Sequence, residues 1–162
     1  MPYARDRTMS GDLLSTIRSV QPQDRNNWLL LRQALWPDAT LEEHTRDVER
    51  FLAGNRHEPA EVLIAFNGEG RAIGFVELSI HNIVDSCSTD RVGYLEGWYV
   101  VPDARRQGVG AALVAAAERW ATEEGCREFA SDAALDNEQS QRAHLALGFT
   151  ETGRNVNFRK DL

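Results

Sequence analysis

Apolar residues recur at helical spacing in three segments of the chain, so that each segment presents one apolar face to a core. These segments are residues 24–36, 40–53 and 108–124, and we predict a fourth, shorter helix over 137–147 that Gly148 closes. The second helix begins with a capping box, Thr40-Leu-Glu-Glu43, in which each side chain bonds the other's backbone N–H. Its expected buried side consists of Leu41, Val48, Phe51 and Leu52.

Runs of β-branched and aromatic residues predict the strands. They cover residues 15–20, 61–67, 72–80, 95–101 and 126–132, with one or two final strands in 149–160. The second and third of these form a hairpin across Gly68-Glu-Gly-Arg71. The resulting order, β-α-α-β-β-β-α-β-α-β, predicts an α+β fold: one domain from residue 15 to 162, a mostly antiparallel sheet with helices on its faces, and a disordered lead-in over 1–14.

A glycine-containing loop joins the strand at 95–101 to the helix at 108–124. It reads Arg105-Arg-Gln-Gly108-Val-Gly110, directly after Pro102. Glycine lets the backbone approach a ligand closely, and the free N–H groups of a helix N-terminus favour an anion. With two arginines adding positive charge, the loop is interpreted as a pyrophosphate cradle.

The cradle lacks the features of two common phosphate loops. No Lys-Ser/Thr pair ends it, as a P-loop requires, and Leu113 stands where the dinucleotide fingerprint needs a third glycine. Asp132 does lie about twenty residues on, as that fingerprint asks. The simplest alternative is a βα turn that needs two glycines and binds nothing.

Length and composition narrow the function classes. A chain of 162 residues matches one domain with a real core, and no apolar run approaches membrane-span length. The net charge of −7 disfavours nucleic-acid binding and suits a cationic substrate. The four histidines show no metal-ligand spacing, so we predict no metal. Cys87 and Cys126 are expected to be free thiols in a reducing cytoplasm, and the polar N-terminus lacks a secretory signal.

The pattern Arg105-x-x-Gly108-x-Gly110 after Val-x-Pro102 resembles motif A of the GNAT superfamily of N-acetyltransferases, and the element order matches it from about Ser15 to Leu162. The resemblance implies a sheet splayed between its fourth and fifth strands, with acetyl-coenzyme A as co-substrate. It assigns the pyrophosphate to Arg105, Arg106, Gln107, Gly108, Val109 and Gly110, and the pantetheine arm to the main chain of Trp98, Tyr99 and Val100 and to Asn137. Asn137 is alternatively a simple helix cap.

Two residues are candidates for proton transfer. His144 lies where many superfamily members carry the tyrosine that protonates the departing thiolate, and histidine suits proton transfer near neutrality. Glu96 lies in an otherwise apolar strand beside the expected thioester position, where it takes up a proton through a water or fixes a cationic substrate. The alternatives are a structural histidine and a surface carboxylate.

Short matches around Trp36, Glu96 and Glu128–Asn137 resemble bacterial aminoglycoside 6′-N-acetyltransferases. The resemblance implies that Trp36 packs on the sugar and that Glu96 and Asp132 bind its ammonium and hydroxyl groups. Glu77 or Asp85 is expected at most to add negative field. Trp36 as helix-end packing and Asp132 as the cap of a βα turn stay open. The loop after the third strand lacks the substrate-contacting tyrosine of some relatives.

The same resemblance implies a homodimer. Two other functions remain: a GNAT enzyme for another small amine or a protein N-terminus, and a module that binds acyl-coenzyme A without turnover. Release of free thiol on a panel of amines separates the three.

Overall fold

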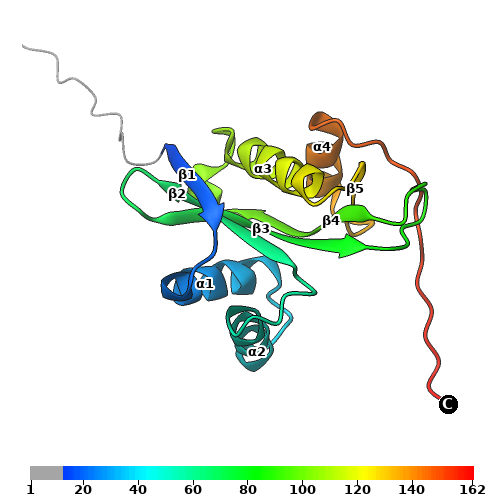
Figure 1. The fold of residues 1–162 in the computed structure, drawn as a ribbon, viewed down its shortest axis with the longest axis horizontal. Helices are drawn as coiled ribbons and strands as arrows, with labels where there is room; N and C mark the ends of the chain where they lie inside the picture. The colour runs from blue at the N-terminus through cyan, green and yellow to red at the C-terminus, as the bar shows by residue number, and fades with distance from the viewer. Residues whose placement is uncertain (1–12) are drawn as a thin grey trace, which may run out of the picture.

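A twisted sheet of five strands organises the part of the chain that the computed structural model describes, residues 13–162 (Figure 1). Its strands are β1 (Leu14–Ser19), β2 (Glu61–Asn67), β3 (Ala72–His81), β4 (Val92–Val100) and β5 (Glu128–Ser131). They neighbour one another in chain order, antiparallel except for the parallel pair β4–β5. The predicted α+β class with a mostly antiparallel mixed sheet is confirmed.

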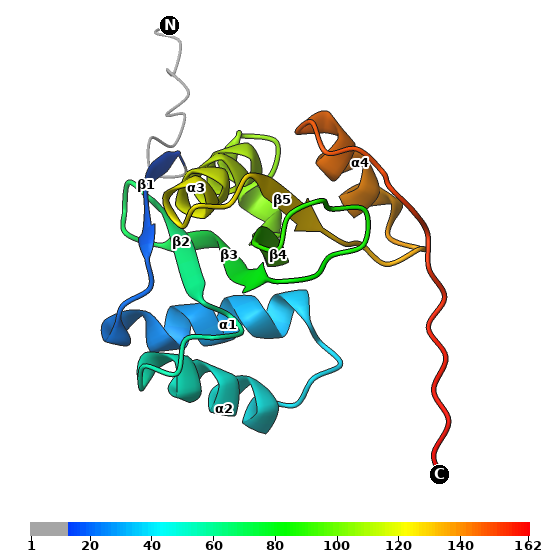
Figure 2. The same cartoon turned by 45° about the vertical axis from the view of Figure 1, so that its right-hand side comes forward.

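Helices cover both faces of the sheet, as predicted (Figures 1 and 2). On one face lie α1 (Arg25–Leu35) and α2 (Leu41–Leu52), and on the other lie α3 (Val109–Glu123) and α4 (Glu138–Ala146). Each face has its own apolar core. Trp28, Phe51 and Phe75 fill the α1–α2 side, whereas Leu78, Leu95 and Leu113 belong to the α3 side.

The capping box of α2 is confirmed, but the expected burial of Leu41 is wrong. Thr40 Oγ1 accepts from the Glu43 backbone N–H, and Glu43 accepts from the Thr40 N–H. Leu41 is 57% exposed. One turn later the polar His44 is buried instead, because its Nε2 lies 3.0 Å from the carbonyl oxygen of Trp36. A hydrogen-bonded histidine thus occupies a place that apolar periodicity alone does not reveal.

The prediction of one or two final strands in 149–160 is wrong. Phe149 packs on Phe129, but residues 149–162 form no strand, and Val156 and Phe158 are 68% and 94% exposed. The segment runs away from the sheet (Figures 1 and 2). At the other end, β1 begins at Leu14, one residue before the predicted boundary, and the rest of the predicted lead-in, 1–12, lies outside the described residues.

The sheet is forked between β4 and β5. Pairing joins Val92–Leu95 to Glu128–Ser131 and stops there, while β4 continues to Val100. The last five residues of β4, 96–100, therefore have β3 on one side and no strand on the other among the described residues. This is the splay that the sequence predicts.

Candidate active site

The loop before α3 presents a set of unbonded amides. Gly108 is the N-cap of α3 with φ +82°, and Arg106 has φ +61°. The backbone N–H groups of residues 106–111 donate to no other described residue. A Cβ on Gly108 would meet nothing within 4 Å, so the space beside it is open. Free amides, a helix N-terminus and exposed arginines together suit an anion.

The predicted cradle residues have different surroundings. Arg105 Nε bonds the carbonyl oxygen of Val100 at 2.9 Å, and Gln107 Nε2 bonds that of Asp103 at 3.0 Å, so both side chains also hold the loop together. The side chain of Val109 is buried in the core, which leaves only its backbone for a ligand. Arg106 is exposed.

Gly110 is needed for a packing contact that the sequence does not reveal. A Cβ there would lie 3.0 Å from Cζ2 of Trp98, so the missing side chain makes room for this indole. The indole also meets the ring of His144 edge-on at 5.4 Å. Gly110 thus brings the strand and the helix together, in addition to any approach of a ligand.

The backbone N–H and C=O groups of β4 point alternately toward β3 and toward the fork. The N–H of Val101 bonds the carbonyl of Ile73 in β3, so the N–H and C=O of Tyr99, two residues earlier, also face β3. The N–H and C=O groups of Trp98 and Val100 face the fork. Arg105 occupies the Val100 carbonyl. The expectation that the Tyr99 main chain lines the fork is therefore wrong, whereas the Trp98 groups and the Val100 N–H remain available.

His144 lies beside the fork with both ring nitrogens engaged. Nδ1 is 2.8 Å from the carbonyl oxygen of Ser140, and Nε2 is 2.9 Å from Oγ of Ser131. The Ser131 hydroxyl in turn donates to the carbonyl of Leu95, the last β4 residue before the fork opens, at 3.2 Å. The ring is thus tied through one hydroxyl to the apex of the fork.

Glu96 sits in a β-bulge. Glu77 pairs with Gly97 and Leu78 with Leu95, so Glu96 is the extra residue. The bulge directs its carboxylate to His81, whose Nε2 lies 2.6 Å from Oε1. His81 shares the α1 face of β3 with Glu77, whereas Trp98 and His144 belong to the α3 side. The two predicted catalytic residues therefore flank β4 from opposite faces.

Asp132 is linked to Glu96 and His81 through Tyr94. The Tyr94 hydroxyl donates to Oδ1 of Asp132 at 2.8 Å, and its ring lies 4.5 Å from that of His81. Burial, together with the carboxylate of Asp132, raises the pKa of Tyr94, so the phenol remains a donor. Glu96 and Asp132 thus belong to one group, and the Asp132 carboxylate bonds Tyr94 rather than a backbone N–H of the described residues. The sequence assigned no role to His81 or Tyr94.

Trp36 forms a wall beside this group. It follows α1 and packs on Gly97, where a Cβ would lie 2.6 Å from Cη2 of the indole. The guanidinium of Arg32 lies 4.9 Å from the ring centroid. Trp36 is only partly buried.

Glu77, which was expected at most to add negative field, is paired with a cation inside the α1 face. Its carboxylate is buried, accepts from Trp28 Nε1 at 2.8 Å and pairs with Arg32 at 2.6 Å. Burial raises the pKa of Glu77, and the adjacent guanidinium opposes that shift. The Glu77–Arg32 ion pair joins β3 to α1. Asp85 is exposed in the loop after β3.

Asn137 caps α4, the alternative that the sequence left open. Its side-chain oxygen accepts from the Ser140 N–H at 3.0 Å. The amide nitrogen remains free to bond a ligand, so both roles are compatible. The residue is exposed at the start of the helix.

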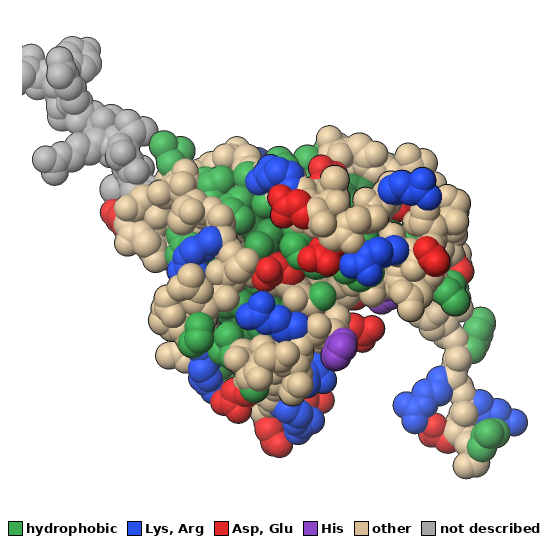
Figure 3. All heavy atoms as spheres, viewed as in Figure 1, with side chains coloured by type: hydrophobic (Ala, Val, Ile, Leu, Met, Phe, Trp, Pro, Cys, Tyr) green, Lys and Arg blue, Asp and Glu red, His purple; other side chains and the backbone are tan. Residues whose placement is uncertain are grey.

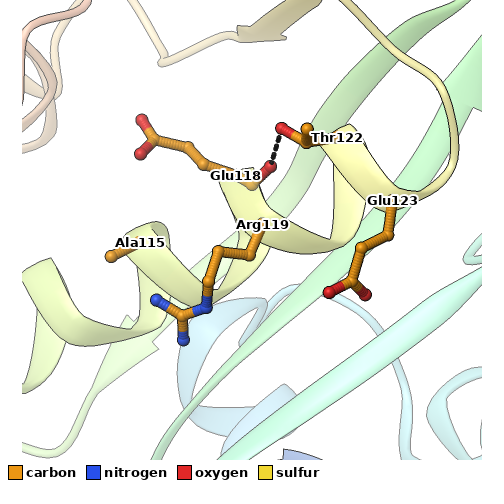
Figure 4. A pocket seen from close by; sticks show the side chains of 5 residues that line it. All are labelled: Ala115, Glu118, Arg119, Thr122 and Glu123. Carbon is orange, nitrogen blue, oxygen red and sulfur yellow. Dashed lines mark hydrogen bonds between the residues drawn. The ribbon is translucent and has the colours of Figure 1, made fainter.

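A hollow along α3 offers no second site. A hollow of about 440 Å³ is lined by Ala115, Glu118, Arg119, Thr122 and Glu123. All five come from α3, where the Thr122 hydroxyl bonds the Glu118 carbonyl, so this is an open helix surface (Figure 4). Within residues 13–162 no three His, Cys, Asp or Glu side chains gather to hold a metal. The described helices are too short or too polar to span a bilayer.

Comparison with known proteins identifies the family. A family model described as "Acetyltransferase (GNAT) family" matches residues 28–149. The chain belongs to this acetyltransferase family. The acetyltransferase is 53% identical over 146 residues to an aminoglycoside N(6′)-acetyltransferase type 1 of Klebsiella aerogenes. The match covers 90% of this chain and 96% of the relative.

Solved structures agree with this identification. Two structures of the aminoglycoside N-acetyltransferase AAC(6′)-Iy are 40% identical to this acetyltransferase with a TM-score of 0.83. One is a complex with CoA, and the other is a complex with the bisubstrate analog CoA-S-monomethyl-acetylneamine. The matches cover 91% of this chain and 95% and 98% of theirs. The predicted family, fold and acyl donor are confirmed.

Proposed function

We propose that this acetyltransferase transfers the acetyl group of acetyl-coenzyme A to the 6′-amine of aminoglycosides and thereby confers resistance. The observation that carries the proposal is the pair of carboxylates, Glu96 and Asp132, that lies beside the partly buried Trp36 and next to the fork of the sheet. A polycationic sugar requires several carboxylates and a flat apolar wall. The names of the relatives support the same substrate class.

The donor fits the free groups of this chain. The amides of residues 106–111, with Arg105 and Arg106 nearby, suit its diphosphate. The main-chain groups of Trp98, the Val100 N–H and the Asn137 amide suit the amide groups of its pantetheine arm. Bound acetyl-coenzyme A supplies the thioester carbonyl that the amine attacks. His144 is the proposed acid for the departing thiolate, and Glu96 acts at the amine.

An assay of released thiol tests the proposal. Kanamycin with its 6′-amine should support thiol release from acetyl-coenzyme A, and the 6′-hydroxyl analogue should not. Expression in a susceptible bacterium should raise the kanamycin concentration needed to stop growth. Equal turnover of both compounds would exclude 6′ selectivity, and turnover of small amines alone would assign a different substrate.

We also propose that the enzyme is a cytoplasmic homodimer. Cys87 and Cys126 are free thiols, as expected for a reducing compartment. The outer edge of β5 has no neighbour among the described strands, and an open edge is a surface for strand addition. Sedimentation velocity should give the mass of two chains at micromolar concentration.

A further inference from the structure

His81 differs from the other three histidines in its hydrogen bonds. His44 and His144 have both ring nitrogens engaged. His57 is exposed between α2 and β2. His81 bonds Glu96 through Nε2, and its Nδ1 has no partner among the described residues. The side chains of His81 and Glu96 are each 30% exposed, so a ligand can reach them.

The short contact fixes where the proton lies. A carboxylate has no proton to donate, so a 2.6 Å bond between Glu96 and Nε2 requires the proton on Nε2. The neutral ring then carries its lone pair on Nδ1. Tyr94 packs on the ring and is itself held by Asp132. The imidazole is therefore oriented from two sides, with one nitrogen free to accept a proton, which is the arrangement of a histidine base with a carboxylate partner.

We propose that His81 is the base of the reaction and that Glu96 positions it. The inference rests on the proposed function, because the proton donor is the 6′-ammonium of the aminoglycoside. Nδ1 takes one proton from this ammonium and frees the nitrogen lone pair. The C–N bond then forms as the C–S bond breaks, the second amine proton passes to solvent water, and the thiolate takes its proton from His144.

Charge in the pocket agrees with this role. The groups that face His81 include Glu96 and Tyr94 from β4, with Asp132 behind the phenol. This set contains no cation and two carboxylates, those of Glu96 and Asp132. The same carboxylates attract the cationic substrate, and His81 beside them removes a proton from its ammonium.

Nitrogen NMR of the histidine rings tests the arrangement without turnover. In the wild-type protein, His81 should carry its proton on Nε2 with Nδ1 bare, and Glu96→Gln should abolish this preference. A wild-type ring protonated on Nδ1 would overturn the proposal. His57→Gln serves as a control that leaves the His81 signals in place.

Thiol release with kanamycin and tobramycin between pH 6 and 9.5 tests the chemistry. Because a general base contributes about 10²–10⁴-fold, His81→Gln should lower kcat about 100-fold at pH 7 and move the rising limb of kcat/KM to higher pH. The KM for acetyl-coenzyme A should stay within about twofold, and imidazole should partly restore His81→Ala. A His81→Gln enzyme with the wild-type profile overturns the His81 role alone. A wild type without turnover on either drug overturns the proposed function and this inference together.

Discussion

Gly97 is the residue on which the Trp36 wall depends. A Cβ there would lie 2.6 and 2.8 Å from two ring atoms of Trp36, both closer than atoms can approach. Gly97→Ala should displace the indole, destabilise the fold by about 1–3 kcal/mol and raise the KM for kanamycin. Urea unfolding and steady-state kinetics measure the two effects. Gly153→Ala is the control, since a Cβ there meets nothing within 4 Å, and wild-type stability of Gly97→Ala would contradict this packing.

Ser131 orients His144. The Ser140 carbonyl can only accept, so Nδ1 donates the hydrogen bond between them. The Ser131 hydroxyl has one proton and can donate either to the Leu95 carbonyl or to Nε2. A protonated His144, the form that an acid needs, satisfies every partner at once. Ser131→Ala should therefore lower kcat about three- to tenfold, the loss of one hydrogen bond, and leave the KM for acetyl-coenzyme A within about twofold.

Ser140→Ala is the matched control for this variant. The Ser140 hydroxyl lies 3.4 Å from Nδ1, while the bond that holds the ring comes from the backbone carbonyl, which alanine retains. Stopped-flow measurement of thiol release compares the two variants. Equal losses of kcat would mean that the Ser131 hydroxyl has no special part in holding the acid.

The sequence indicates which residue types belong to the candidate site better than it indicates which of them are in contact. Glu96 stands out because it interrupts an apolar strand, and the structure joins it to the group that also holds Asp132. His81 lies fifteen residues earlier, and only the pairing register and a bulge bring it to Glu96. A bulge has no clear sequence signal, so this pair could not be found. Its only trace is that residue 81 directly follows the predicted strand at 72–80.

At the scale of elements, Glu128 ties the loop after β3 to β5. Its carboxylate accepts from the Thr89 hydroxyl and from the backbone N–H groups of Ser88 and Thr89. These bonds, that from the Thr89 hydroxyl foremost, lower the pKa of Glu128 from 4.5 to about 2. The ionised form is thus favoured by folding. Its contribution to stability is complete above about pH 4.5 and is lost as the pH falls toward 2.

Glu128→Gln should therefore lower the Tm at pH 7 and match the wild type more closely as the pH falls below 4.5. Thermal unfolding at a series of pH values measures this convergence, and hydrogen exchange at Ser88 and Thr89 should accelerate in the variant at pH 7. Glu118→Gln, on the exposed surface of α3, is the control. A Tm difference that stays constant down to pH 2 would rule out titration of Glu128 as its cause.

The sequence predicts where helices and strands begin and end wherever a local signal exists. The capping box fixes the start of α2, and Gly125 and Gly148, both with positive φ, follow the ends of α3 and α4. The start of β4 was placed three residues late, at Leu95 rather than Val92. Gly93 weakens the strand signal there, although a Cβ at this position would meet Ala121 at 2.7 Å. The glycine serves helix–sheet packing, which depends on contacts distant in sequence.

At the scale of the whole molecule, β4 separates two chemical compartments. The α1 face holds Trp36, Glu96 and His81, and the α3 face holds Trp98 and His144. In the proposed mechanism, the amine is presented from the α1 face, the thiolate is protonated from the α3 face, and the two meet at the fork between β4 and β5. Two different residues, His81 and His144, are therefore proposed as base and acid.

For the proposed homodimer, the C-terminal segment is the element that we expect to join the two chains. Residues 150–162 are exposed throughout and stand clear of the body, with apolar and charged side chains both turned to solvent (Figure 3). Val156 and Phe158 have the alternate spacing of one strand face. In the proposed homodimer, the second copy offers the backbone the open edge of β5, so we expect the segment to pair there.

Removal of residues 150–162 should then leave a monomer that still unfolds cooperatively, because the two apolar cores contain none of these residues. Val156→Ser with Phe158→Ser in the full-length chain should weaken the dimer at least tenfold, since two large apolar side chains lose about 1.5–3 kcal/mol of burial each. Sedimentation velocity over a range of concentrations measures both effects, with Thr152→Ser as the matched control. A truncated chain that sediments as two copies would place the interface elsewhere.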